Sequence, residues 1–246
     1  MERNFKLTIE YDGSAFHGWQ RQSSDPTIQG TIEAALGKMT RSSISLIGSG
    51  RTDAGVHATG QIANFHCDTA LTPQTFIKGL NSLLPDDIVI KACLEVGDSF
   101  HARYDAKSKT YVYRICNASL PSAIGRQYSW HVRKKLDTEM MKAAIDYFVG
   151  THDFKSFEGA GSPRSTTIRK IMAATLEAKD GATLLFTVKA DGFLRFMVRN
   201  IVGTLVDVGG GRISPDDVPA ILAARDRNLA SATAPPHGLF LMKVEY

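Results

Sequence analysis

The order of apolar patterns over residues 5–96 constrains the fold of this chain more than any other feature of its sequence. Residues 5–11 alternate between apolar and polar, as in a half-buried strand, and residues 88–96 alternate again. Apolar residues recur at helical spacing after Thr27 and again after Thr72, and each of these threonines can act as an N-cap. Pro73 suits a first helical position. Between these helices, residues 44–47 and 60–67 indicate two further strands.

This order of strand, helix, strand, strand, helix and strand is the ferredoxin-like or RRM-like arrangement. It predicts an α+β fold in which a mainly antiparallel sheet carries its helices on one face. The other face of the sheet would then be left open for a ligand.

A second series of elements follows a basic stretch at residues 100–109, where we place a domain junction. The series begins with a strand that has Tyr111, Tyr113 and Ile115 on one face, and Asp137 can cap the next helix. After a loop at residues 158–166, a hairpin of residues 168–178 and 184–189 is expected to turn at Asp180. The chain is thus expected to form two tandem α+β halves, residues 1–103 and 104–246.

The last long helix is predicted by a four-residue repeat of apolar side chains. These side chains are Phe193, Met197, Ile201 and Leu205. The helix would end at glycines 209–211 and would carry Arg195 and Arg199 four residues apart. Like charges at that spacing repel by a few tenths of a kcal/mol. An anionic partner bound to both arginines would make their interaction energy favourable.

A glycine-rich loop, residues 48–57, lies between the two inner strands of the first half. Three glycines allow tight turns and close approach to a ligand, and Asp53 and Arg51 lie between them. An ordinary connection with Asp53 in an Asx turn is an equally good interpretation of these residues alone. A phosphate-binding P-loop is disfavoured, because no lysine follows the glycines in the required order.

Composition limits the class of protein and the partners. The chain has 246 residues, 43% of them hydrophobic and 22% charged, as in ordinary globular proteins. Its apolar runs are too short for a membrane span and its start lacks a signal peptide, so we expect a cytoplasmic protein. Three cysteines without a Cys-x-x-Cys pair indicate neither a disulfide framework nor a zinc site, and no metal is expected.

The net charge of +4 favours polyanionic partners only mildly, but arginines recur beside aromatic residues. This interleaving suits the binding of phosphates and stacked bases, although each single pair is also typical of a half-buried strand. The pairs and groups are Trp19 with Arg21, Arg103 with Tyr104, Tyr113 with Arg114, and Phe193 and Phe196 around Arg195.

Residues 50–57 resemble the catalytic loop of the pseudouridine synthases, most closely that of the tRNA pseudouridine synthase A family. Similarity to that family extends over residues 11–22, 100–103, 197–203 and 234–241, with Tyr111 and Tyr113 between them. Asp105 departs from the family, in which a small polar residue is common at this position.

The resemblance implies an enzyme that isomerises uridine to pseudouridine at positions 38, 39 and 40 of the tRNA anticodon stem-loop. In the family, the matching aspartate is the nucleophile, which here is Asp53, and its arginine partner matches Arg199. Tyr111 would stack on the base, and Arg51 would contact the RNA backbone. Further RNA contacts are expected from Trp19, Gln20, Arg21, Arg103 and Arg195. On sequence chemistry alone, Trp19 is better explained as a packing residue.

The resemblance further implies that the first half carries the catalytic loop and the second completes an RNA-binding cleft between the halves. It implies a homodimer that binds tRNA and needs neither cofactor nor metal. Two other classes remain open. An RNA-binding module could use the same sheet without catalysis. A glycoside hydrolase would need a second carboxylate beside Asp53, for which Glu33 or Asp105 would have to serve.

Overall fold

A computed structural model describes residues 2–161 and 165–246 of the chain, so that part of the loop expected at residues 158–166 lies outside the described residues. The fold is α+β, as predicted, and mainly antiparallel. The chain divides into two compact units. Unit 1 comprises Met1–Lys107 and Phe240–Tyr246, and unit 2 comprises Ser108–Leu239.

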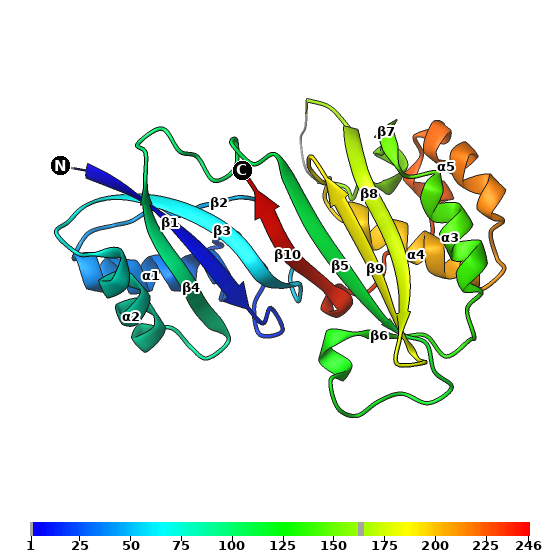
Figure 1. The fold of residues 1–246 in the computed structure, drawn as a ribbon, viewed down its shortest axis with the longest axis horizontal. Coiled ribbons are helices and arrows are strands. Elements are labelled where there is room, and N and C mark those ends of the chain that lie inside the picture. Colours follow the sequence, from blue (N-terminus) through cyan, green and yellow to red (C-terminus); the bar gives the residue numbers. More distant parts are fainter. Residues whose placement is uncertain (1, 162–164) are drawn as a thin grey trace. The chain divides into compact units, whose positions relative to one another are not determined.

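Unit 1 has the predicted order of elements (Figure 1). In its sheet β1 lies between β4 and β3 and is antiparallel to both, and β2 is antiparallel to β3. This strand order, β4-β1-β3-β2, is the ferredoxin-like one. The elements are β1 (Glu2–Tyr11), α1 (Ile28–Thr40), β2 (Ile47–Gly48), β3 (His57–Asp68), α2 (Pro73–Leu83) and β4 (Ile88–Val96).

The helices of unit 1 cover one face of its sheet, as expected. Phe5 on β1 is fully buried, and its ring centroid lies 4.9 Å from that of Phe76 on α2. Helix α1 packs beside α2, where Met39 fills the space over Gly79. On the opposite face, Lys6 lies 5.5 Å from the ring centroid of Phe100, so that this part of the face is covered.

The C-terminal strand β10 (Leu239–Glu245) pairs in parallel with β3. It was expected in the second half, but Phe240 is aligned with His57, and Lys107 donates its backbone N–H to the carbonyl of Glu245. A Cβ at Gly60 would lie 2.3 Å from the carbonyl oxygen of Met242, so this close approach of β10 requires glycine. Unit 1 is therefore built from both ends of the described chain.

Unit 2 contributes further antiparallel strands and the remaining helices. Its strand order is β5-β9-β8-β7, and β6 pairs in parallel with β5. Tyr111, Tyr113 and Ile115 share the buried face of β5, as predicted. The elements are β5 (Ser108–Cys116), β6 (Trp130–His131), α3 (Thr138–Asp146), β7 (Gly150–Asp153), β8 (Ile168–Lys179), β9 (Thr183–Ala190), α4 (Met197–Gly209) and α5 (Val218–Ala224).

Local sequence signals placed most of the boundaries correctly. The side chains of Thr27, Thr72 and Asp137 each cap the following helix. Asp180 and Gly181 turn the β8–β9 hairpin with φ values of 50° and 70°. Such a pair of positive φ angles matches the twist of hairpin strands.

The start of α4 differs from the prediction. The helix begins at Met197, and Phe196 before it has a φ of 61° in the left-handed region. The prediction that Arg195 shares this helix with Arg199 is therefore wrong. Phe193 fitted the four-residue repeat, but its ring packs edge-on against Tyr111 of β5, at a centroid distance of 5.0 Å.

Among the described residues, no helix is both long and apolar enough to cross a membrane. In the same part of the chain, no three His, Cys, Asp or Glu side chains are grouped so that they could hold a metal ion. The three cysteines are unpaired thiols, and burial raises the pKa of Cys93 to about 12.

Candidate active site

The loop that carries Asp53 joins β2 to β3 in unit 1 and is held largely by its backbone. Thr52 accepts a hydrogen bond from the backbone N–H of Trp19 at 3.0 Å, and Gly55 donates to the carbonyl of Phe16 at 3.4 Å. Inside the loop, Val56 donates to the carbonyl of Asp53 at 3.1 Å. Asp53 is a half-buried residue of a loop whose course these bonds fix.

Two glycines of the N-terminal loop let its backbone lie directly on the Asp53 loop. Gly18 has a φ of 89°, and a Cβ there would lie 2.7 Å from the carbonyl oxygen of Thr52 and 3.1 Å from the carbonyl carbon of Asp53. At Gly13 a Cβ would lie 2.1 Å from the carbonyl oxygen of Val56. Sequence reasoning missed this role, although a glycine directly before a tryptophan in a polar loop was an available signal.

Trp19 is a packing residue. Its side chain is 2% exposed, and the indole lies so close to Gly48 that a Cβ there would be 2.5 Å from Nε1. This burial supports the packing role of Trp19, and its contact with RNA stays an expectation of the resemblance. The indole packs against Gly48, the last residue of β2.

Polar side chains hold both sides of the loop. The Tyr11 hydroxyl lies 2.7 Å from Thr52 Oγ1, and burial raises the pKa of Tyr11 above its ordinary range. At the other side, His57 is buried with Nδ1 3.0 Å from Asp12 Oδ1, and its ring stacks on Phe240. Neither interaction was predicted from the sequence.

The predicted polar contacts near the loop form a connected group. Arg51 is exposed and donates from Nε to Gln20 Oε1 at 2.9 Å. Arg21 donates from Nη1 to Glu33 Oε2 at 3.1 Å. Arg103, also exposed, lies outside this group, with its guanidinium 5.5 Å from the ring centroid of Tyr104.

Neither candidate for a second catalytic carboxylate is suited to that role. Glu33 is 7% exposed, and its oxygens accept hydrogen bonds from Gln29, Arg21 and the backbone N–H of Leu46. Asp105 accepts a bond from the backbone N–H of His101 at 2.9 Å. Both carboxylates serve local structure, which weakens the glycoside hydrolase alternative.

Arg199 lies on α4 in unit 2 and is held by the segment that follows α5. Its Nε donates to the carbonyl of Ala234 at 2.7 Å, and Ala234 returns a backbone bond to the carbonyl of Arg199 at 3.1 Å. The segment is held in turn by Asn200, a fully buried side chain that accepts hydrogen bonds from Arg227 and Thr233. A buried asparagine on an apolar helix was a signal that sequence reasoning missed.

The guanidinium groups of Arg195 and Arg199 both lie over the ring of Phe196. Arg195 lies 4.7 Å and Arg199 4.9 Å from its ring centroid, within the range of a cation–π contact. Arg195 also donates from Nη1 to the carbonyl of Ala160 at 2.6 Å. A Cβ at Gly159 would lie 2.3 Å from Phe196 Cδ2, so glycine leaves room for the ring.

The predicted site residues therefore fall into two groups. Asp53, Arg51, Gln20 and Arg21 lie together in unit 1, and the second group is in unit 2. There Tyr111 is 7% exposed on β5, beside Phe193. That Asp53 meets Arg199 and Tyr111 stays a prediction of the resemblance.

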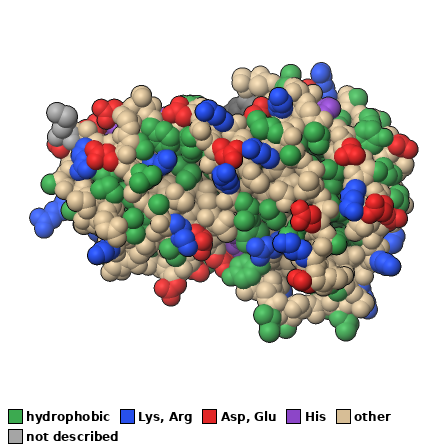
Figure 2. Space-filling model, in the orientation of Figure 1, with side chains coloured by type: hydrophobic (Ala, Val, Ile, Leu, Met, Phe, Trp, Pro, Cys, Tyr) green, Lys and Arg blue, Asp and Glu red, His purple; other side chains and the backbone are tan. Residues whose placement is uncertain are grey.

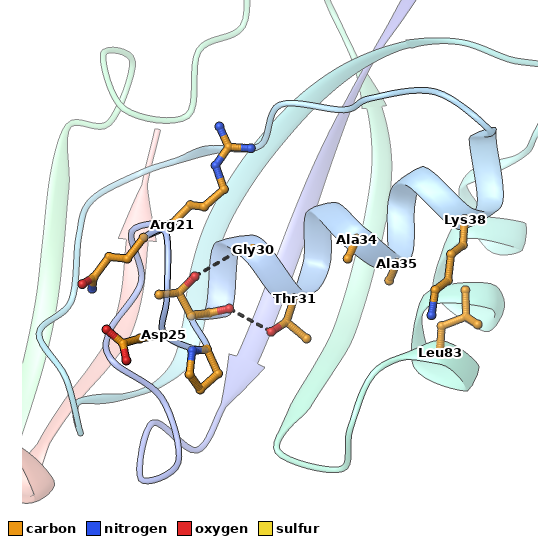
Figure 3. Close-up of a pocket in the computed structure, with 11 residues that line it drawn as sticks. Arg21, Asp25, Gly30, Thr31, Ala34, Ala35, Lys38 and Leu83 are labelled. Carbon is orange, nitrogen blue, oxygen red and sulfur yellow. Dashed lines mark hydrogen bonds between the residues drawn. The ribbon is translucent and has the colours of Figure 1, made fainter.

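A groove of about 470 Å³ runs along α1 (Figure 3). Arg21 and Asp25 lie toward one end and Lys38 and Leu83 at the other. None of its lining residues belongs to the Asp53 loop, so the groove is not the candidate active site. Figure 2 shows lysine and arginine side chains spread over the visible face and interspersed with acidic ones.

Comparison with known proteins identifies relatives over almost the whole chain. The family model described as tRNA pseudouridine synthase matches residues 7–105 and 144–246. A protein of Acetivibrio thermocellus named tRNA pseudouridine synthase A is 49% identical over 99% of this chain and 100% of its own length. The protein of the same name from Geotalea uraniireducens is 47% identical, again over 99% of this chain and 100% of its own length.

Proposed function

This chain belongs to the tRNA pseudouridine synthase family, and we propose that it forms pseudouridine at positions 38, 39 and 40 of the tRNA anticodon stem-loop, with Asp53 as the nucleophile. The family reaction is an isomerisation of uridine in tRNA. The bond from uracil N1 to ribose C1′ breaks, the base turns, and C5 is joined to C1′. No atom is gained or lost.

The observation that carries the proposal is the placement of Asp53. It is the only acidic residue of the glycine-rich loop at residues 48–57, and backbone bonds from Trp19 and Val56 fix the loop on both sides of it. Catalytic groups gain most when their position is fixed before substrate binds. A carboxylate held in this way, in a chain of this family, is the best candidate for the reacting group.

An ionised carboxylate can act in three ways here: it can attack C1′, add to the uracil ring, or accept a proton on the way to a glycal. Each requires Asp53 to be charged. A guanidinium close to a carboxylate lowers its pKa and favours the charged form. We assign that role to Arg199, because it matches the arginine partner of the family; its Nε donates to Ala234, and its guanidinium lies over the ring of Phe196.

The target base must leave its stack, at a cost of a few kcal/mol. Stacking on an aromatic ring returns about 1–3 kcal/mol for each base. We assign this contact to Tyr111, whose ring is fixed edge-on by Phe193. In this proposal Tyr111 and Arg199 of unit 2 complete the site of Asp53.

The proposal includes the partners and location that the resemblance implies. The substrate is tRNA, the enzyme is a homodimer, and it works in the cytoplasm, where tRNA is found. It needs neither cofactor nor metal, because the isomerisation exchanges no electrons and the carboxylate supplies the nucleophile. Arg51 contacts the RNA backbone, with further contacts from Arg21, Arg103 and Arg195.

The test is Asp53→Asn. Asparagine is nearly isosteric and keeps an acceptor oxygen, but it lacks the charge and the nucleophilicity. Tritium release from C5-labelled uridine in tRNA should vanish, while tRNA affinity and melting temperature hold. The matched control is Asp98→Asn, an exposed aspartate of the same unit, which should keep full activity. Substantial release by the Asp53 variant would refute the proposal.

Analysis of the RNA product separates the competing classes. Isomerisation leaves the mass of the RNA unchanged and converts uridine into pseudouridine. A glycoside hydrolase would remove uracil and lower the mass, and an RNA-binding module would leave the uridine as it was. Liquid chromatography coupled to mass spectrometry of tRNA digested to nucleosides, before and after incubation with the protein, distinguishes all three, because pseudouridine has the mass of uridine but elutes separately from it.

A further inference from the structure

A chain of hydrogen bonds leads from a buried carboxylate to the exposed Arg51 of the Asp53 loop. Glu33 Oε1 accepts from Gln29 Nε2 at 2.9 Å, and Gln29 Oε1 accepts from Gln20 Nε2 at 2.9 Å. Gln20 Oε1 then accepts from Arg51 Nε at 2.9 Å. All four residues lie in unit 1, and Glu33 and Gln29 are each only 7% exposed.

The orientation of the Gln29 amide is fixed by groups that cannot reverse. Its Nε2 donates to a carboxylate, Glu33, and to the backbone carbonyl of Leu46 at 3.1 Å. Its Oε1 accepts from the backbone N–H of Arg21 at 3.0 Å and from Gln20. The two N–H groups and the two acceptor positions of the Gln29 amide are thus all used. If the amide were flipped, its oxygen would face the oxygens of Glu33 and Leu46, and its NH₂ group would face the N–H groups of Arg21 and Gln20.

The fixed amide of Gln29 dictates the orientation of Gln20. Because Gln29 presents an acceptor, Gln20 must turn its NH₂ group toward Gln29 and its oxygen toward the Asp53 loop. That oxygen is what the Nε–H of Arg51 requires. A reversed Gln20 would place its NH₂ group against the guanidinium of Arg51. The carboxylate of Glu33 therefore determines the direction of every hydrogen bond in the chain, through the amides of Gln29 and Gln20.

The bond to Gln20 holds Arg51 by its inner edge. It uses Nε, while the outer Nη groups of this exposed guanidinium can form the paired bonds that Arg makes to a phosphate. An exposed arginine normally samples many rotamers and loses that freedom when it binds. Gln20 restricts this sampling before any ligand arrives.

We propose that Gln20 is a positioning residue, oriented by Gln29 and Glu33, that holds the guanidinium of Arg51 ready for a backbone phosphate of the RNA. This inference rests on the proposed function in one respect, the contact between Arg51 and the RNA. It reassigns Gln20, which the resemblance placed among the direct RNA contacts. Gln20 acts on the RNA through Arg51.

The test is a double-mutant cycle of Gln20→Met and Arg51→Met, measured as tRNA affinity. Methionine keeps the length of glutamine and the aliphatic part of arginine, and it removes the hydrogen bonds of both side chains. Immobilising a side chain such as arginine on binding costs enough that Gln20→Met should weaken tRNA binding about two- to tenfold. In the Arg51→Met background the same change should have no further effect.

Gln22→Met is the matched control. Gln22 is an exposed glutamine of the same loop that donates to the carbonyl of His17 at 3.0 Å and does not belong to the chain of bonds. It should bind tRNA as the unchanged protein does. Melting temperatures of all variants should agree closely, because the replaced side chains are exposed.

Two results would overturn the inference. Equal losses for Gln20→Met in both backgrounds would show that Gln20 contacts the RNA itself, and no loss in either would show that it contributes nothing. The cycle is run on the Asp53→Asn protein, so its outcome does not depend on turnover. Failure of the proposed function would appear elsewhere, as tritium release by Asp53→Asn or as absence of tRNA binding by the unchanged protein.

Discussion

The Asp53 loop in unit 1 and the start of α4 in unit 2 hold their functional side chains by different means. The loop lies against another piece of backbone, and Gly18 is what allows the two to approach. At the start of α4, Arg199 and Arg195 donate to backbone carbonyls, but the group that lies against both guanidinium groups is a side chain, the ring of Phe196. Backbone cannot move aside without changing the course of the chain, whereas a ring can rotate, so the two regions should differ in tolerance to substitution.

The largest effect is expected from Gly18→Ala. Alanine at a φ of 89° is strained, and its Cβ would lie 2.7 Å from the backbone of Thr52. The strain and the overlap together should cost about 2–4 kcal/mol of unfolding free energy. Displacement of the Asp53 loop should lower turnover by on the order of 10²-fold. Urea unfolding and tritium release measure the two effects.

Gly125→Ala separates strain from overlap. Gly125 has a similar φ of 72°, but nothing lies within 4 Å of a Cβ placed there. It should cost about 1 kcal/mol and leave turnover unchanged. Equal behaviour of the two alanine variants would mean that contact with the Asp53 loop is unimportant.

Next in size is Arg199→Lys. Lysine keeps the charge but cannot donate to Ala234 through an Nε–H while it presents a planar group over Phe196. We expect turnover to fall by on the order of 10²-fold with little change in melting temperature. Arg195→Lys, at the other side of the same ring, should alter mainly tRNA affinity. Unchanged turnover in Arg199→Lys would show that Arg199 is an ordinary surface charge.

Gly159→Ala should have a smaller effect than Gly18→Ala, although its Cβ would approach a neighbour more closely, at 2.3 Å. The neighbour is the ring of Phe196, which can turn away. We expect a loss of about 1 kcal/mol in unfolding free energy and a roughly tenfold loss of turnover as the support of Arg199 shifts. If Gly159→Ala proved more damaging than Gly18→Ala in both measurements, the distinction between backbone and side-chain support would be wrong.

The smallest effect is expected from Tyr11→Phe, which removes the hydroxyl bonded to Thr52 and should cost about 1 kcal/mol. Burial raises the pKa of Tyr11 above its ordinary value of 10.0, so the folded protein holds the phenolic proton more tightly than the unfolded chain. This contribution is complete below pH 10 and is lost as the pH rises further. Unfolding measured between pH 8 and 11 should therefore show a shallower alkaline decline in the phenylalanine variant.

Local sequence signals predicted elements well and the relations between distant elements poorly. Thr27 and Thr72 were correct as caps because capping depends only on a few neighbouring residues. The start of α4 was wrong because Phe193 is apolar for another reason, its contact with Tyr111 on a different element. The return of Phe240 to pair beside His57 likewise had no local signal.

The candidate site followed the same division. Asp53 and Arg51 could be singled out because the glycines that mark the loop lie within a few residues of them in the sequence. The support that Gly18 and Tyr11 give to the loop depends on contacts with residues more than 30 positions away, which no pattern in one sequence specifies. Trp19 was expected both as a packing residue and as an RNA contact, and its burial supports the packing role.

The parallel pairing of β10 with β3 also bears on the synthesis of the chain. A ribosome makes Phe240–Tyr246 only after all of Ser108–Leu239. At about 5–20 residues per second, the first 107 residues wait roughly 7 to 26 seconds for their last strand. Until then His57, at the end of the Asp53 loop, lacks the ring of Phe240 on which it stacks. The nascent chain therefore acquires the complete surroundings of this loop only after the whole of unit 2 has been made.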